Sequence, residues 1–186
     1  MDLILLQPGD SSLLGTAPIA ADSHLTTDQA WRTQLPELGP CIELISLHQG
    51  MKQQMTTDIS NSARSSGRPV VTEFTCVKYV DQSSVKLYDH CLRAQPLGQG
   101  AEQPSRIYIC RNTGDAIATI MSFALRDAII SEIQLQSHPD DMPTEQFKLN
   151  FTEILWAYHT QSAREPGTSQ HAGWSLMRNR PITAFS

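Results

Sequence analysis

Serine, lysine, histidine and cysteine stand close together at two places where the chain could carry out nucleophilic catalysis. Ser83 precedes Lys86 by three residues, so in a helix the lysine amine could reach and activate the serine hydroxyl. Enzymes of that kind also carry a Lys-Thr-Gly segment, which this sequence lacks, and a serine at this position is explained by helix capping. Asp89, His90 and Cys91 are adjacent, and neighbours in a helix point about 100° apart, which prevents a hydrogen-bonded relay. Neither place predicts an active site.

A third candidate nucleophile is Ser11, which follows an apolar run and the residues Gly9 and Asp10. This segment resembles the start of GDSL-type hydrolases, in which the serine attacks an ester. Such a serine needs a histidine that removes its proton, and that family supplies it in a late Asp-x-x-His motif. None of the six histidines has an aspartate three positions before it. A hydrolase using Ser11 therefore remains an alternative, and a plain turn explains the segment better.

Metal and cofactor sites are not predicted. Asp140, Asp141 and Glu145 could bind a hard cation, but no glycine-containing loop of alternating acidic ligands surrounds them. The histidines are scattered singly, and the four cysteines form no paired C-x-x-C pattern. We expect no metal, no cofactor and reduced, buried thiols.

Composition and charge exclude several classes of function. The chain of 186 residues has a net charge of -5 and only 14 lysines and arginines, which argues against binding to nucleic acid. The start of the chain lacks the basic region and the long apolar run of a secretory signal. No run approaches the roughly 20 apolar residues of a membrane span. These features predict synthesis in the cytoplasm and no insertion into a membrane.

Periodicity predicts many short strands and one helix. A helix over residues 83–94 is predicted because Val85, Tyr88, Cys91 and Leu92 recur at helical spacing before Pro96. Alternating or β-branched segments predict strands at 3–6, 41–47, 70–80, 106–111, 116–126, 128–136 and 147–160. Two longer segments lie between these strands. Residues 17–40 have no sustained periodicity and are expected to form a long connection, and residues 49–68 are polar.

This pattern predicts a mainly β fold. One helix among seven or more strands indicates a two-sheet β-barrel or sandwich, with the helix closing an end or an edge. We expect a single domain over residues 1–186, with an insertion at 17–40 and a long projecting loop at 49–68.

Several segments resemble the Hcp family, the tube proteins of the bacterial type VI secretion system. The strongest likeness is the Lys-Tyr-x-Asp-x-Ser core at Lys78–Ser83 within residues 74–84, where a strand enters the single helix. Residues 107–136 resemble the long hairpin of the family. Residues 144–151 resemble a late strand, and Gly173 and Trp174 resemble the C-terminal closure. Together these segments cover most of residues 42–181, and the long 17–40 segment departs from the family pattern.

The resemblance implies a structural function and no enzymatic activity. Hcp subunits form six-membered rings that stack into a hollow tube, which is made in the cytoplasm and secreted without a signal peptide. The implied partners are further copies of the chain, the spike and the contractile sheath of the machine, and small effector proteins held in the lumen. A tail-tube protein of a phage or of an extracellular injection particle is an alternative of the same class. A free-standing secreted binding protein is an alternative of another class.

Within this interpretation, the polar loop is expected to contact the next ring. The residues expected to make this contact are Met51, Lys52, Arg64 and Arg68, and the last three give the loop a basic character that differs from the acidic chain as a whole. An acidic surface would complement it, and the candidates are Asp140, Asp141 and Glu145. Trp174 is expected to anchor the C-terminal strand in the core.

Overall fold

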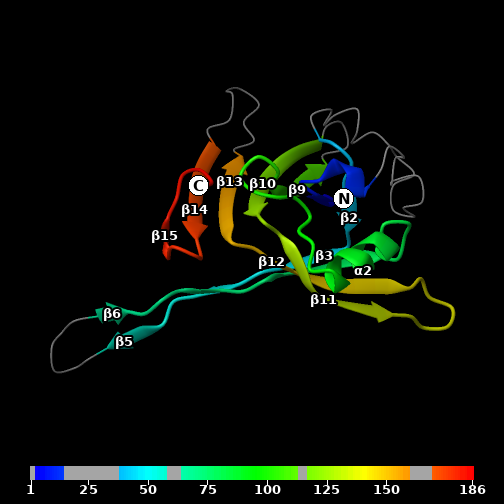
Figure 1. Cartoon of the computed structure of the whole chain (residues 1–186), viewed down its shortest axis with the longest axis horizontal. Coiled ribbons are helices and arrows are strands. Elements are labelled where there is room, and N and C mark those ends of the chain that lie inside the picture. Colours follow the sequence, from blue (N-terminus) through cyan, green and yellow to red (C-terminus); the bar gives the residue numbers. More distant parts are fainter. Residues whose placement is uncertain (1–2, 15–37, 58–63, 113–116, 160–168) are drawn as a thin grey trace.

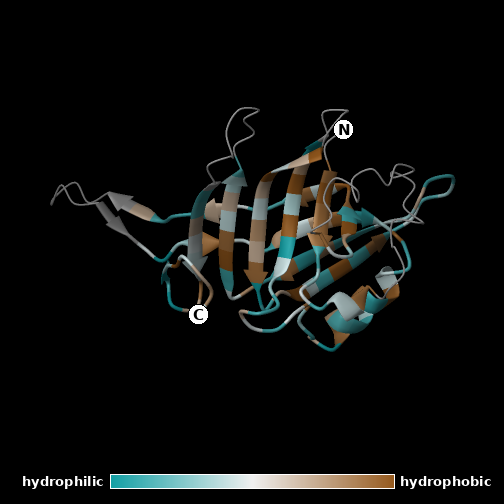
Figure 2. Ribbon diagram, turned by 90° about the horizontal axis from the view of Figure 1, so that it is seen from above, coloured by the Kyte–Doolittle hydropathy of each residue, from teal (hydrophilic) through white to brown (hydrophobic). Residues whose placement is uncertain are grey.

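Seven described strands form the larger of two antiparallel sheets, called sheet A here, in the order β15-β14-β13-β10-β9-β1-β2. The structure is a computed structural model that describes residues 3–14, 38–57, 64–112, 117–159 and 169–186 (Figure 1). The strands of sheet A are β1 (Leu3–Gln7), β2 (Ile42–Leu44), β9 (Ser105–Asn112), β10 (Ile117–Arg126), β13 (Glu153–His159), β14 (Ser169–Ser175) and β15 (Arg180–Pro181). Figure 2 shows hydrophobic and hydrophilic residues alternating along these strands, as expected for a sheet that buries one face.

The smaller sheet, called sheet B, has the strand order β11-β12-β8-β3. Its strands are β3 (Ser46–His48), β8 (Phe74–Tyr79), β11 (Ile129–Gln136) and β12 (Thr144–Asn150). Along β8 and β12, buried residues alternate with half-buried ones, so one face of sheet B points into the core. The predicted mainly β fold with two sheets is therefore confirmed, and within the described residues the sheets are not closed into a barrel.

Three segments pass from one sheet to the other without a long connection. The predicted strand at 41–47 is divided at Ile45 into β2 in sheet A and β3 in sheet B. The predicted strand at 147–160 is divided in the same way between β12 and β13, and β10 continues into β11 through a corner at Asp127. Asp127 has a positive φ of 50°, and its carboxylate accepts hydrogen bonds from Gly100 N at 2.7 Å and Thr152 Oγ1 at 3.2 Å. These bonds hold the corner in a conformation that non-glycine residues rarely adopt.

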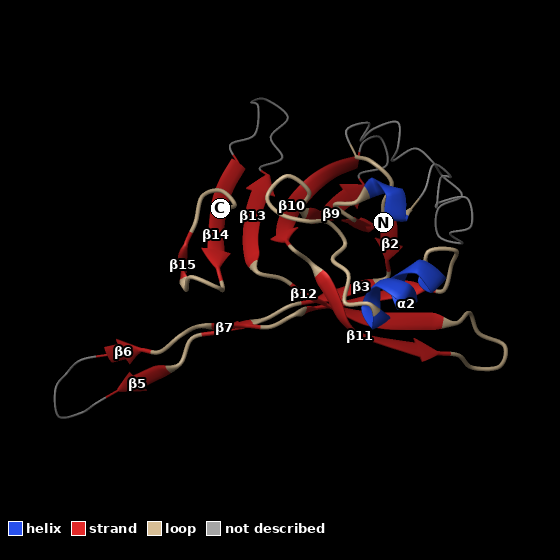
Figure 3. Cartoon of the chain, in the orientation of Figure 1, coloured by secondary structure: helices blue, strands red, loops and turns tan. Residues whose placement is uncertain are grey.

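The helix α2 (Ser84–Leu92) lies beside β11 of sheet B (Figure 3). It agrees with the predicted helix at 83–94, and its buried residues are Ser84 and Leu87. After the helix the chain stays close to the edge of sheet B, because Leu97 N donates to the Ala128 carbonyl at 2.8 Å. The segment that follows the helix is thus held against the same sheet.

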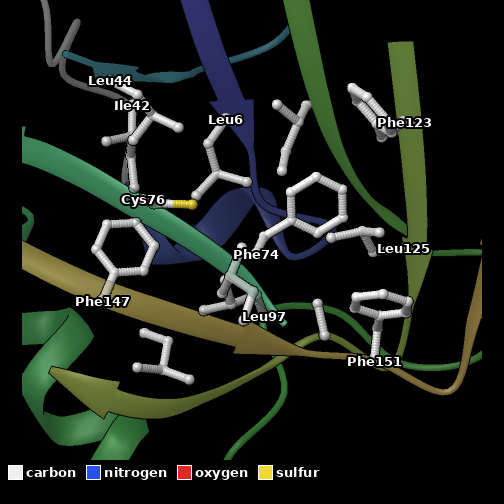
Figure 4. Close-up of a cluster of buried hydrophobic side chains, with 14 of the residues drawn as sticks. Leu6, Ile42, Leu44, Phe74, Cys76, Leu97, Phe123, Leu125, Phe147 and Phe151 are labelled. Atoms are coloured by element: carbon white, nitrogen blue, oxygen red, sulfur yellow. The ribbon is translucent and has the colours of Figure 1, made fainter. Parts of the chain in front are cut away.

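Phenylalanine side chains fill the space between the two sheets (Figure 4). The Phe74 ring of sheet B lies edge-on to Phe123 of sheet A, with ring centroids 5.2 Å apart. Phe151, at the corner between β12 and β13, lies 5.7 Å from Phe74. Such edge-to-face and tilted arrangements are the favoured geometries of aromatic pairs. The core therefore couples both sheets and one of the corners.

A smaller apolar cluster lies on the other face of sheet A. It is made of Leu3, Leu5, Cys41, Cys110 and Ile117. The alternation along β1 explains it, since Leu6 joins the main core while Leu3 and Leu5 join this second cluster. Strand β1 is therefore buried on both faces.

All four cysteines are free, and Cys41, Cys76 and Cys110 are buried as expected, whereas Cys91 is half-buried. Burial raises the pKa of the Cys76 thiol far above its usual range. Burial also raises the pKa of the Cys110 thiol, although a contact with Thr119 opposes this shift. Buried thiols with raised pKa values are poor nucleophiles. No helix in the described ranges is long and apolar enough to cross a membrane.

Candidate functional site

A two-stranded arm built from residues 51–71 projects from the body of the protein (Figure 1). Its base is a pair of short strands, β4 (Met51–Lys52) and β7 (Val70–Val71). Thr72 closes this base, because its backbone N donates to the Gly50 carbonyl at 2.9 Å and its Oγ1 accepts from Gly50 N at 2.8 Å. The predicted projecting loop at 49–68 is thus an extended hairpin.

The outer part of the arm is held by backbone pairing. Strands β5 (Met55–Thr57) and β6 (Arg64–Ser66) pair antiparallel, with Thr57 opposite Arg64. Between the two strand pairs, Gly67 N donates to the Gln54 carbonyl at 3.0 Å. The backbone of Arg64 therefore lies in the outer pair, and residues 58–63 lie outside the described residues.

Large apolar side chains are exposed along the arm. The exposed fractions are 54% for Met51, 53% for Met55 and 48% for Val70. A two-stranded ribbon without a hydrophobic face to bury is only marginally stable in water. An arm with exposed methionines therefore has the properties of a surface that becomes buried against another molecule.

The predicted basic residues of the arm have different roles. Lys52 is exposed at the base, and it forms no ion pair with another described residue. Arg68 is also exposed, but its guanidinium donates to the backbone carbonyl of Leu176, which follows β14. Arg68 therefore ties the arm to the C-terminal part of sheet A, and Lys52 is the better placed of the two for an external contact.

Trp174 lies next to the hydrogen bond between Arg68 and Leu176. It is half-buried, it packs against the main core, and its strand β14 pairs with β13 and β15. Together with Arg68 and Leu176 it lines a groove of about 400 Å³ between the arm base and β14. Trp174 thus stands at the edge of the core, where the arm joins the body.

Asp140 and Asp141 form the turn between β11 and β12, at the end of the molecule opposite the arm (Figure 1). Both residues are exposed, and Asp140 has a positive φ of 67°. The Asp141 carboxylate accepts a hydrogen bond from Met142 N at 2.8 Å, which fixes the turn. The two aspartates therefore offer a negative charge at the far end of the long axis.

Glu145 differs from these aspartates, because its side chain is fully buried in β12. Its Oε1 accepts from Lys78 Nζ at 2.8 Å and from Ser84 Oγ at 2.8 Å, and its Oε2 accepts from Tyr88 at 2.7 Å. Glu145 therefore does not belong to an exposed acidic surface, and the expectation for this residue is corrected. The acidic side chain of Glu145 suggested an exposed position. However, Glu145, Phe147 and Leu149 alternate along β12 on the face that points into the core, and this alternation indicates burial.

Lys78 is the buried partner that sequence reasoning did not assign. It alternates with Phe74 and Cys76 on the inward face of β8, and its Nζ also lies 3.0 Å from the Asp81 carboxylate. Burial and the hydrogen bond to Glu145 raise the pKa of Tyr88 to about 12, so Tyr88 remains a donor at neutral pH. The Lys-Tyr-x-Asp-x-Ser segment thus supplies the lysine of a buried charge pair with Glu145, and the helix residues Ser84 and Tyr88 bind the same glutamate.

The candidate catalytic residues are not assembled into an active site. Ser11 is exposed in a short 3-10 helix (Ser11–Leu13), which Asp10 caps by accepting from Ser12 N at 2.9 Å. Asp89 pairs with Arg93 at 2.7 Å across one helical turn, so it does not orient His90. Among the described residues, no group of three or more histidine, cysteine, aspartate or glutamate side chains could hold a metal ion.

Comparisons with known proteins agree with this architecture. The family described as "Type VI secretion system effector, Hcp" matches residues 40–158. No curated protein sequence matches the chain. A solved structure of a type six secretion system protein is 18% identical with a TM-score of 0.73, and the match covers 98% of this chain and 100% of that chain.

Two further solved structures have the same fold. Hcp1 from Salmonella typhimurium is 16% identical with a TM-score of 0.64, covering 97% of this chain and 99% of that one. The secreted protein Hcp3 from Pseudomonas aeruginosa is 17% identical with a TM-score of 0.56, covering 92% of this chain and 97% of that one. At these identities the likeness concerns the fold.

Proposed function

Because this chain belongs to the Hcp family, the secreted and non-enzymatic tube proteins of the type VI secretion system, we propose that it forms six-membered rings that stack into a hollow tube. The observation that carries the stacking step is the arm at residues 51–71. It exposes Met51, Met55 and Val70, and among the described residues its strands pair only with one another, in two two-stranded sheets. In this proposal the arm of one ring is buried against the next ring.

Charge supports the same contact. The arm carries Lys52 and Arg64, and the turn at the opposite end of the subunit carries Asp140 and Asp141. A surface and its complement at opposite ends of one molecule make a head-to-tail contact, and repetition of that contact along an axis gives a fibre. In the proposed tube, the arm therefore meets the Asp140 turn of a subunit in the adjacent ring.

The partners of the tube follow from the family. The tube carries a spike at its tip and moves inside a contractile sheath, and small effector proteins travel in its lumen. The chain is made in the cytoplasm and leaves the cell with the tube.

The test uses the purified full-length chain at micromolar concentration. Native mass spectrometry is expected to show six-membered rings, and negative-stain electron microscopy is expected to show rings and short tubes at low ionic strength. Lys52→Glu combined with Arg64→Glu is expected to keep the rings and abolish tubes and secretion. This pair is preferred to a variant of Arg68, whose guanidinium binds the Leu176 carbonyl within the same subunit.

The matched control reverses one exposed lysine away from the arm, Lys86→Glu on α2. It is expected to form tubes like the parent. A parent protein that stays monomeric over the whole micromolar range overturns the ring proposal. Parental secretion by the double arm variant overturns the assignment of the arm to the stacking contact.

A further inference from the structure

The face of sheet A that points away from the main core carries a hollow of about 890 Å³. Strand register places its residues in two adjacent rows across five strands. Of the lining residues, one row holds Tyr108, Ser122, Ala157 and His171, and the other holds Gln7, Arg106, Ala124 and Leu155. The hollow is therefore built by regular strands within one subunit.

Small residues form the floor of the hollow. Ala124 and Ala157 occupy the middle of the two rows, and larger side chains surround them. Beside the hollow, Gly173 lets the lining residues Leu155 and Ile182 pack closely, because a Cβ at this position would lie 2.4 Å from Leu155 Cδ2 and 2.7 Å from the Ile182 carbonyl. The hollow exists because the sheet places small residues where a flat surface would need large ones.

Among the described residues, the lining of the hollow carries positive or protonatable groups and no carboxylate. Arg106, His159 and His171 line it, and none of its described lining residues is aspartate or glutamate. Ser122 Oγ lies 3.1 Å from His159 Nε2, and Tyr108 donates to Gln7 Oε1 at 3.2 Å, so two of its polar side chains are held in place. The chain as a whole has a net charge of -5, so the charge around the hollow is opposite in sign to that of the chain.

Carboxylates on the same face lie outside the hollow. Glu43 stands opposite Leu5 on β2, beyond the lining residues. Glu153 is buried and is already bound by Arg126 and Ser186. Neither of them neutralises Arg106 across the hollow.

We propose that this hollow binds an acidic peptide segment, with a glutamate or aspartate carboxylate of the peptide on Arg106. A guanidinium binds a carboxylate through two parallel hydrogen bonds, and Leu155 and Tyr108 offer apolar surface beside it. The volume lies within the range of about 300–1,000 Å³ typical of ligand sites, which suits several side chains of an extended segment. This inference deepens the proposed function, since the peptide would belong to a protein carried by the tube.

The test measures fluorescence anisotropy of a fluorescein-labelled hexaglutamate peptide with the purified full-length chain at low ionic strength. Hexaglutamate is expected to bind, and a hexaglutamine peptide is not. Arg106→Ala is expected to weaken binding by about tenfold, the effect of losing one charge-assisted contact. Ala124→Leu fills the floor without changing charge and is expected to weaken binding to a similar extent. The melting temperature of each variant confirms that it is folded.

Arg178→Ala, which removes an exposed arginine outside the hollow, serves as the matched control and is expected to bind like the parent. Equal loss in all three variants, or no loss with Arg106→Ala and Ala124→Leu, overturns the site. Competition by citrate at the concentration of the peptide assigns the site to small anions and overturns the peptide ligand. Native mass spectrometry of the same samples reports ring formation separately, so failure of the hollow and failure of ring assembly give different results.

Discussion

The ammonium nitrogen of Lys78 lies 2.8 Å from the Oε1 atom of Glu145, and both side chains are fully buried. The two residues stand directly opposite each other on β8 and β12. Ser84 and Tyr88 bind the same carboxylate from α2, so the pair joins the helix to sheet B. A buried charge pair of this kind is costly to break, because the remaining charge is left without its partner in a region that excludes water.

Breaking this pair is expected to destabilise the protein strongly. Lys78→Met or Glu145→Gln should each lower the free energy of unfolding by about 3 to 5 kcal/mol. The double variant removes both charges and should lose clearly less than the sum of the two single variants. Chemical denaturation of the four proteins measures this cycle. Additive losses would show that the two side chains do not depend on each other.

We expect the protein to lose stability in acid because of Glu153. Burial would raise the pKa of Glu153, but hydrogen bonds from Ser186, Arg126 and Ser175 outweigh it and hold the pKa at about 2. Because this folded value lies below the usual value near 4.3, the carboxylate stabilises the fold above about pH 4.3, and this contribution is lost as the pH falls toward 2. Glu153→Gln should therefore lose less melting temperature than the parent between pH 5 and pH 3. An identical loss in both proteins would contradict this role.

We expect Trp174, which lies where the arm joins the body, to contribute to the free energy of unfolding. Trp174→Ala removes a half-buried indole that packs on the core, and it should cost about 2 to 4 kcal/mol of unfolding free energy, somewhat less than for a fully buried tryptophan. Trp174→Phe keeps most of the contact and should cost less. Thermal melts of both variants check the order. An unchanged melting temperature for Trp174→Ala would place the side chain outside the folding core.

Alternation along the chain predicted the strands well and their division between sheets poorly. The 41–47 and 147–160 segments each read as one strand, because residues near Ile45 and Phe151 keep the polarity of a strand while the chain turns into the other sheet. Such corners depend on packing between the sheets and on hydrogen bonds such as those to Asp127. These interactions join residues far apart in the sequence, so no local sequence pattern predicts the corners.

The candidate site shows the same limit. Residue types predicted a projecting, locally basic segment, and the structure has an arm at that position. They did not predict that Arg68 binds the Leu176 carbonyl or that Glu145 is buried with Lys78. In both cases the partner lies more than 60 residues away in the sequence. The alternation of β8 and β12 held the signal for the buried pair, since both charges fall on the inward positions.

The last prediction concerns the contact between the arm and the Asp140 turn. Attraction between exposed charges is screened over a Debye length of about 8 Å at physiological ionic strength, so tubes should dissociate into rings as salt is raised. Exposed pairs are weak individually, but a tube repeats the contact around every ring, so a small change at each subunit is multiplied. Exchanging the charges across the contact should therefore restore what reversing one side removes.

Lys52→Glu with Arg64→Glu should abolish tubes, and Asp140→Lys with Asp141→Lys should do the same. A chain with all four substitutions restores opposite charges across the proposed contact and should form tubes again. Sedimentation at low and high salt measures tube content, and native mass spectrometry confirms that every variant still forms rings. If the fourfold variant stays as single rings while both pairs of substitutions leave the fold and the rings intact, the Asp140 turn is not the partner of the arm, and the arm must contact another surface of the next ring.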